Sequence, residues 1–283
     1  MTNRVAQRRF AFTLFSGILA CWMVWLWPGS TYSETDGSPL SLSAAPTIPS
    51  SDSIPSTPEG DRIWLGYNLI MNTQTNAKAY VGNGLSCRNC HLDAGRKVGA
   101  GTYVGVIYAY PQYKARAGKE ISLVDRINEC FERSLNGKAL PPQSLEMDAI
   151  QAYISWLSQN VPPSADLSWL GFPLVKMTQK TDRQHGQQVF TNSCANCHGL
   201  DGQGTMMAPP LWGPRSFNIA SGLARLSKAA GFIKTTMPFT QPGSLPDADA
   251  YDVAAFMNSH PRPDYPLKAF DYPKGGKPAD LPY

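Results

Sequence analysis

The sequence lacks a strong excess of charge of either sign. Its 25 lysines and arginines stand against 21 aspartates and glutamates, so the formal net charge is +4. A balance this mild points neither to a nucleic-acid partner nor to a polybasic tail. Sustained period-two alternation is also absent, and we therefore expect few strands. The 283 residues are long for one domain and comfortable for two small ones.

The six cysteines do not read as a simple disulfide framework, although cysteines of exported proteins usually pair. Four of them form two C-x-x-C pairs, and a histidine follows each pair directly. Two cysteines at i and i+3 can reach the vinyl groups of one porphyrin, and the next residue then places an imidazole under the iron. One such motif could be a zinc half-site or a redox pair. Two in one exported chain predict two covalently bound haem c groups, attached by Cys87, Cys90, Cys194 and Cys197, with His91 and His198 as proximal ligands.

The N-terminus has the pattern of an export signal. Three arginines precede an apolar run over residues 10–27, which is about long enough to span a bilayer and contains three tryptophans near its end. No clear cleavage site follows. We expect an uncleaved signal-anchor in residues 1–28, with a cleaved signal peptide as the alternative. Residues 29–58 hold nine Ser, five Pro and four Thr, which predicts a linker that tethers a periplasmic protein to the cytoplasmic membrane.

The rest of the chain repeats one plan of helix, C-x-x-C-H, loop and helix. Apolar spacing predicts helices that begin at Asp61 and that cover residues 121–135, 147–159, 182–191, 223–235 and 247–259. We therefore expect an all-α fold of two tandem cytochrome c-like domains, residues 59–170 and 171–283. The last residues, 261–283, hold six prolines and no helical period, so they predict an extended tail along the surface.

The sixth iron ligand of the second haem is expected to be Met237. It stands 39 residues after His198, in the usual cytochrome c order. A thioether opposite imidazole raises the reduction potential of a haem. Met206 and Met207 are the competing candidates, but they follow the histidine closely and lie in a glycine-rich loop.

The first haem domain has no methionine before Met147 and has Cys130 instead. Arg126, Cys130 and Ser134 fall at i, i+4 and i+8, so a helix would align them in one stripe. A small buried cysteine is the common alternative. A cysteine flanked by cations suits a thiolate, however, and binding to iron would deprotonate it outright. Residues 110–140 hold six cations, which are either a solvated face or, if they turn inward, a site for multi-oxygen anions.

Around Cys130 the sequence resembles the diheme thiosulfate dehydrogenases. These are tetrathionate-forming cytochromes whose first domain is similar to the diheme subunit of the Sox sulfur-oxidation system. The resemblance runs from about residue 60 to about residue 265. It is most specific in the pattern R-x-x-x-C-x-x-R-S-x-N-G, met by Arg126, Cys130, Arg133, Ser134, Asn136 and Gly137. It implies that Cys130 is the distal ligand of the first haem and that Arg116, Arg126 and Ser134 line the thiosulfate site.

Some members of that family carry a lysine just before the methionine of the second haem, where this chain has Thr236. The difference favours plain His198/Met237 ligation. The expected reaction couples two thiosulfates to tetrathionate and releases two electrons. Cys130 would engage a sulfane sulfur, the arginines would screen the two dianions, and a soluble c-type cytochrome or similar acceptor would take the electrons. Two alternatives stay open: a diheme electron carrier without its own substrate, and an enzyme acting on another sulfur anion, as in tetrathionate reduction or Sox-type oxidation.

Overall fold

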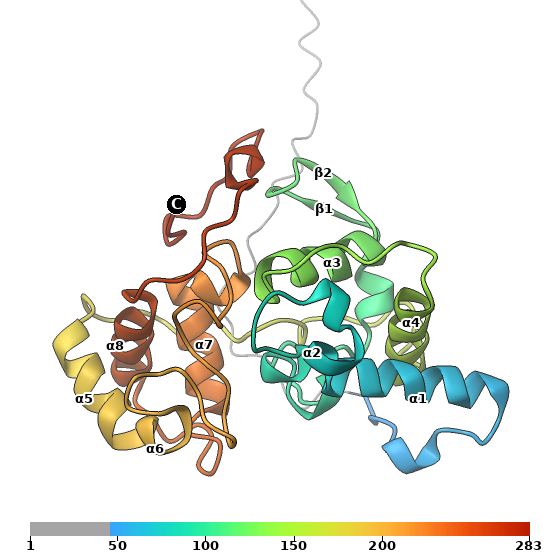
Figure 1. Ribbon diagram of the computed structural model, residues 1–283, viewed down its shortest axis with the longest axis horizontal. Coiled ribbons are helices and arrows are strands. Elements are labelled where there is room, and N and C mark those ends of the chain that lie inside the picture. The colour runs from blue at the N-terminus through green and yellow to red at the C-terminus, as the bar shows by residue number, and fades with distance from the viewer. Residues whose placement is uncertain (1–45) are drawn as a thin grey trace, which may run out of the picture. The chain divides into compact units, whose positions relative to one another are not determined.

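The computed structural model describes residues 46–283, and this part of the chain is mainly helical (Figure 1). Its α-helices are α1 (Pro58–Met71), α2 (Thr73–Asn76), α3 (Leu123–Glu129), α4 (Leu145–Leu157), α5 (Arg183–Ser193), α6 (Ala195–His198), α7 (Leu226–Thr236) and α8 (Asp247–Asn258). Among the described residues, no helix is both long and apolar enough to cross a bilayer. The apolar run over residues 10–27 lies outside the described part.

The first half is built on the contact of α1 with α4 (Figure 1). Thr57 begins α1, because its hydroxyl accepts a hydrogen bond from the backbone N–H of Gly60 at 3.2 Å. Gly66 lies at the crossing, where a Cβ atom would stand 2.0 Å from the carbonyl oxygen of Ala149. Only glycine lets the two backbones approach this closely. The core includes Ile150, Tyr153, Ile154 and Leu157, which lie on the buried side of α4.

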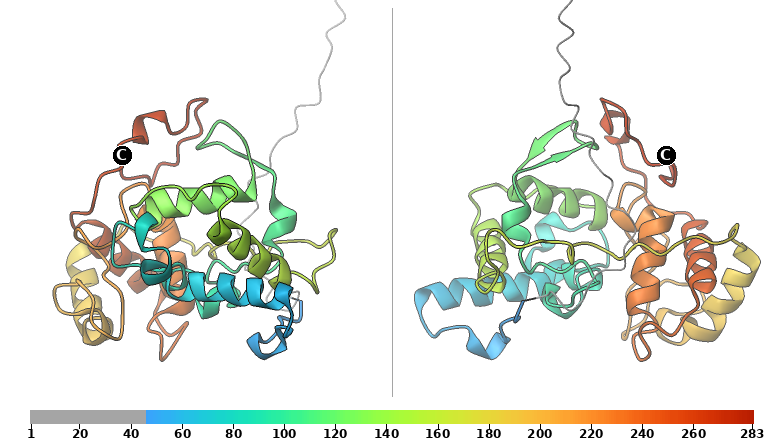
Figure 2. Two further views of the ribbon diagram at one scale, coloured as in Figure 1. Left: turned by 45° about the vertical axis from the view of Figure 1, so that its right-hand side comes forward. Right: turned by 180° about the vertical axis from the view of Figure 1, so that it is seen from behind.

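The second half repeats the arrangement with α5 against α8 and with α7 packed on α8 (Figure 2). Gly186 takes the place of Gly66, since a Cβ atom there would stand 2.0 Å from the carbonyl oxygen of Asp252. The aromatic core contains Phe190, whose ring centroid lies 5.0 Å from that of Trp212. The expected duplication of helix, motif, loop and helix is therefore present in the fold.

All six predicted helices are present, and five of them have ends within three residues of the prediction. The helix expected over residues 121–135 begins at Leu123 and ends at Glu129, because a capping box of Ser122 and Asp125 sets its start. It continues as a π-helical turn, Cys130–Ser134. Before it lies a short antiparallel hairpin of β1 (Gln112–Lys114) and β2 (Lys119–Ile121), in which Lys114 is opposite Lys119.

Two boundary predictions need correction. Residues 46–57, assigned to the linker by their composition, pack on the first half. Ile54 is 7% exposed in its core, and the carbonyl of Thr47 accepts a hydrogen bond from Asn160 at 3.0 Å. The burial of their few apolar side chains is enough to order this segment despite its serine-rich composition. The tail over residues 261–283 lacks long helices, as expected, but it is not confined to the surface, because Tyr265 is only 6% exposed.

Candidate haem and thiol site

The first C-x-x-C-H motif forms a short 3₁₀ turn, Cys87–Asn89, that directly follows a capping interaction. The backbone N–H of Ser86 donates to the side-chain oxygen of Asn89 at 2.7 Å. Thr73 fixes the first cysteine, since its hydroxyl accepts from the N–H of Cys87 at 3.0 Å and donates to the sulfur at 3.2 Å. Burial raises the pKa of Cys87 to about 12. All five described cysteines are free thiols, as thioether attachment requires.

His91 is held in the orientation of a metal ligand. Its Nδ1 lies 2.5 Å from the carbonyl oxygen of Gly101, which leaves Nε2 free to coordinate iron. The ring stacks on Tyr103 with centroids 4.4 Å apart. Burial lowers the pKa of His91 to about 4, so the imidazole is neutral at pH 7, which is the form that binds a metal.

The second motif has the same construction. Its histidine ends the short helix α6, and Nδ1 of His198 lies 2.8 Å from the carbonyl oxygen of Pro209. Burial lowers the pKa of His198 and raises that of Cys194 to about 11. In both halves, a loop carbonyl after the motif sets the histidine tautomer and leaves the other nitrogen free. The two motifs therefore fit covalent haem c.

Cys130 begins the π-helical turn that follows α3. A terminal guanidinium nitrogen of Arg126 donates to its sulfur at 3.0 Å, so the predicted stripe brings these two side chains together. Glu129 lies 3.6 Å from the same nitrogen. The Cys130 sulfur first, and then Glu129, hold the pKa of Arg126 above its usual value despite burial. Short π-helical segments inside helices occur frequently at functional sites.

Ser134 lies at the other end of the π-helical turn. The wider turn changes the rotation per residue, so Ser134 is not simply the next member of an α-helical stripe. Its hydroxyl is 3.1 Å from the hydroxyl of Ser221, which precedes α7. The serine therefore connects the Cys130 turn to the second half. Its role at the site remains a prediction.

Arg116 and Arg133 both interact with the C-terminal tail. Arg133 is 8% exposed and donates two hydrogen bonds to Asp271, at 2.7 and 2.8 Å. Arg116 donates to the carbonyl of Ala220 at 2.7 Å, and its Nε lies 3.9 Å from the same aspartate. The hydrogen bonds of these two arginines are thus made with the tail and the second half rather than with Cys130. A direct role of Arg116 at the anion site remains a prediction.

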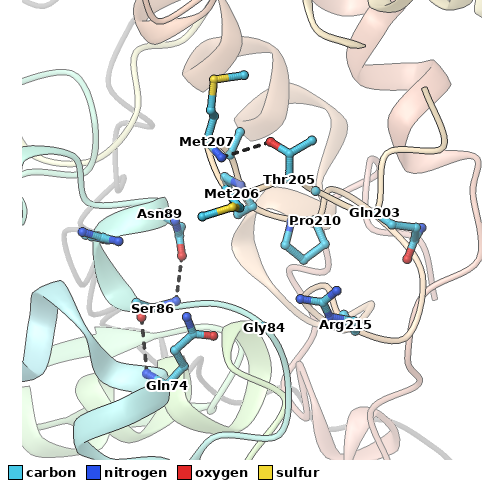
Figure 3. A pocket seen from close by; sticks show the side chains of 14 residues that line it. Gln74, Gly84, Ser86, Asn89, Gln203, Thr205, Met206, Met207, Pro210 and Arg215 are labelled. Atoms are coloured by element: carbon cyan, nitrogen blue, oxygen red, sulfur yellow. Dashed lines mark hydrogen bonds between the residues drawn. The ribbon is translucent and has the colours of Figure 1, made fainter. Parts of the chain in front are cut away.

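The three methionine candidates for the second haem differ in burial. Met237 follows α7 and packs on the core of the second half. Met206 is fully exposed and Met207 is 73% exposed. Both line a cavity of about 430 Å³, whose other wall includes Ser86 and Asn89 of the first motif (Figure 3). This burial favours Met237, because a ligand must reach iron inside a cytochrome domain.

Sequence reasoning missed the residues that orient the candidate ligands. Thr73, Gly101 and Tyr103 carry no motif of their own, and they meet the first histidine or cysteine only in the folded chain. Tyr110 was missed as well, although it lies beside Arg126, which opposes the rise in its pKa on burial. The contact between the carbonyl oxygen of Pro209 and His198 likewise has no signal in the sequence.

Comparison with known proteins supports this assignment of the two halves. Residues 75–162 match the family model described as SoxA/TsdA, cytochrome c domain, and residues 181–257 match cytochrome C oxidase, cbb3-type, subunit III. Thiosulfate dehydrogenase of Allochromatium vinosum is 43% identical over 227 residues, which cover 77% of this chain and 84% of the relative. The chain belongs to the thiosulfate dehydrogenase family. Residues 46–283 are all-α apart from one short hairpin, and the chain has two tandem cytochrome c domains, as predicted.

Other members of the thiosulfate dehydrogenase family agree. The enzyme of Stutzerimonas stutzeri is 40% identical over 224 residues, which cover 77% of this chain and 73% of the relative. The solved thiosulfate dehydrogenase TsdBA from Marichromatium purpuratum, in its as-isolated form, has a TM-score of 0.76 at 33% identity. The match covers 84% of this chain and 55% of the solved one. Cytochrome c domains carry covalently bound haem c, and the free thiols and oriented histidines described above fit that group.

Proposed function

We propose that this chain is a thiosulfate dehydrogenase that joins two thiosulfate ions into tetrathionate: 2 S₂O₃²⁻ → S₄O₆²⁻ + 2 e⁻. A sulfur–sulfur bond forms between the two sulfane sulfurs, and no proton is exchanged. The observation that supports this most directly is the guanidinium of Arg126, 3.0 Å from the free thiol of Cys130. When bound, the two haem c groups would each accept one electron.

We assign the iron ligands residue by residue as part of the same proposal. His91 and Cys130 would ligate the first iron, and His198 and Met237 the second. The free Nε2 of each histidine and the burial of Met237 support these assignments. A thiolate on one iron and a thioether on the other would give the second haem the higher potential. That difference would direct electrons away from the thiosulfate site.

The main electrostatic obstacle is the mutual repulsion of two dianions. At a separation of about 6 Å and an effective dielectric constant of about 20, they repel each other by about 11 kcal/mol. Arg126 is placed to offset this repulsion next to the thiol, and its forked donors match sulfonate oxygens. Ser134 would add a neutral hydrogen bond to the substrate. Arg116 would add positive charge without contacting the thiol.

The electrons would leave to a soluble c-type cytochrome or a similar acceptor. We further propose that the protein works in the periplasm, because the arginines before the apolar run over residues 10–27 form an export signal. Retention of that run would anchor the protein to the membrane.

The test is a ranked series of variants of the holoprotein, after its haem count has been measured by intact mass and pyridine haemochrome. Thiosulfate should reduce the oxidised wild type, and tetrathionate should accumulate with a suitable acceptor. Cys130→Ala should lose nearly all turnover. Arg126→Ala should lose about two to three decades in rate, because it removes a charge next to the thiol. Ser134→Ala should lose less, since a hydroxyl offers only a neutral hydrogen bond.

Arg62→Ala is the matched control, because Arg62 is an exposed arginine paired with carboxylates far from the thiol in sequence. It should keep wild-type turnover. A pure electron carrier would show no thiosulfate-dependent reduction, and would still exchange electrons with small redox proteins. If tetrathionate oxidises the pre-reduced protein while thiosulfate reduces nothing, the working direction is reversed.

A further inference from the structure

Several cations near the Cys130 turn are neutralised by acids of the C-terminal tail. Asp271 pairs with Arg133 and lies 3.9 Å from Arg116. Asp280 accepts from Nε of Arg225 at 2.8 Å and from the backbone N–H of Ser227 at 2.9 Å. Arg133 and Arg225 are therefore poor candidates to attract a further anion, whereas Arg116 shares its acid with Arg133.

Two half-buried lysines have no such partner. Among residues 46–283, neither Lys114 of β1 nor Lys228 of α7 forms an ion pair with an acid. Most exposed lysines need no partner, because water solvates them. Half-buried lysines lose part of that solvation. An unpaired ammonium group in such a position therefore lowers the stability of the fold unless an anion binds next to it.

Lys114 is linked to the thiol through a chain of contacts. Its ammonium group hydrogen-bonds to the side chain of Gln112 and lies 5.5 Å from the ring centroid of Tyr110. Tyr110 lies beside Arg126, which contacts Cys130. Burial first, and then the charge of Arg126, lower the pKa of Lys114, and Lys228 lowers it further. Glu129 is the acid that opposes this shift.

Lys228 approaches the same place from the second half. It lies in the first turn of α7, after the segment whose Ser221 contacts Ser134 at the end of the Cys130 turn. Burial first, and then Arg225, lower the pKa of Lys228, while Asp280 raises it. Lys114 is thus near enough to both Arg126 and Lys228 to be affected by their charges, and the two lysines come from different halves of the chain.

We propose that Lys114 and Lys228 form a second anion position beside Arg126, which holds the sulfonate farther from Cys130. This inference rests on the proposed function and specifies where its second thiosulfate binds. Tetrathionate carries a sulfonate at each end of a four-sulfur chain, so one cationic position cannot neutralise both. Arg126 would bind the sulfonate of the first thiosulfate, and the two lysines that of the second.

The assignment also explains why the lysines stand apart from the thiol. The sulfane sulfurs must meet at Cys130, and each sulfonate then points away from the newly formed sulfur–sulfur bond. Arg126 in contact with the thiol, and Lys114 one contact farther out through Tyr110, match that order. Closure of the site would require both halves of the chain, since Lys228 belongs to the second.

Equilibrium binding of tetrathionate to oxidised holoprotein tests the proposal by calorimetry. No electron donor is added, so the anion binds without reacting. Lys114→Gln and Lys228→Gln should each raise the dissociation constant roughly tenfold or more, the usual size of a lost charge-assisted hydrogen bond. Lys114→Arg should retain most of the affinity. Lys119→Gln and Lys180→Gln are the matched controls, because both lysines are exposed and Lys119 is the hairpin partner of Lys114.

The controls should bind tetrathionate within about twofold of the wild type, and the haem absorption spectrum verifies that each variant is folded. Equal affinities for the two glutamine variants and the controls would overturn the second anion position, as would a loss at only one of the two lysines. Thiosulfate reduction of wild-type haem is measured in parallel. If it fails and the wild type does not bind tetrathionate, the proposed function is at fault instead.

Discussion

The ion pair between Arg133 and Asp271 gives the sharpest stability prediction, because it joins the Cys130 turn to the C-terminal tail. Both carboxylate oxygens of Asp271 accept hydrogen bonds, at 2.8 and 2.7 Å. The side chains of the pair are 5% exposed for the aspartate and 10% for the arginine. The guanidinium also lies 4.3 Å from the ring centroid of Tyr265. The substitution Asp271→Ala would leave a buried guanidinium without its acid.

Removal of one partner of a buried ion pair costs about 3–5 kcal/mol. The aromatic face of Tyr265 would still stabilise the cation by about 1 kcal/mol, so we expect the lower end of the range, about 3 kcal/mol. The tail offers a matched control in Asp264, which pairs with Lys268 but has a side chain that is 63% exposed. Exposed pairs contribute about 0–1 kcal/mol. Asp264→Ala should therefore be close to neutral.

The measurement is urea unfolding of the oxidised holoprotein, followed by circular dichroism at 222 nm. A second variant separates the pair from the general packing of the tail. The double change Arg133→Met with Asp271→Leu removes both charges and should be much less destabilised than Asp271→Ala, since no buried charge remains unpaired. The reasoning is refuted if Asp271→Ala and Asp264→Ala lose the same free energy of unfolding, or if the double variant is as unstable as the sum of its single changes.

Two further predictions follow from the site and from α3. Met237→Ala should abolish the weak near-infrared sulfur-to-iron band of the oxidised holoprotein and lower the potential of one haem, whereas Met206→Ala should change neither; the opposite result would exchange their roles. Ser122→Ala should reduce the free energy of unfolding by about 1 kcal/mol at pH 7. Hydrogen bonds from Ser122 lower the pKa of Asp125, so that contribution is complete above about pH 4 and is lost as pH falls through the lower folded value. The difference between variant and wild type should therefore shrink in acid, and a constant difference would contradict this origin.

The features that could be predicted from the sequence depend on residues that are close together in the chain. Each C-x-x-C-H motif is contiguous, and the helices follow from apolar spacing that is decided within a few turns. The i, i+4 spacing of Arg126 and Cys130 also placed the guanidinium next to the thiol, which the 3.0 Å contact bears out.

The features that could not be predicted depend on segments distant in the chain. The carbonyls that orient His91 and His198 come from loops 10 and 11 residues away, and nothing in those loops marks them as acceptors. The π-helical turn is a similar case, because no residue preference distinguishes it from an α-helix. The linker boundary failed for another reason: composition averages over a segment, and one buried residue, Ile54, outweighs its polar neighbours.

The cations around Cys130 show this limit most clearly. A sequence supplies their number, but the anion site depends on which of them keep an unpaired charge. Arg133 belongs to the family pattern, yet in the fold it is bound to Asp271, 138 residues away. Arg116 lies near the same acid. Lys114 belongs to no motif, forms no ion pair with an acid among residues 46–283, and is affected by the charge of Arg126. In the proposed function, the tail acids would thus determine which charges remain to bind a dianion. In this chain, the tail is as much a part of the site's electrostatics as the helix that carries the thiol.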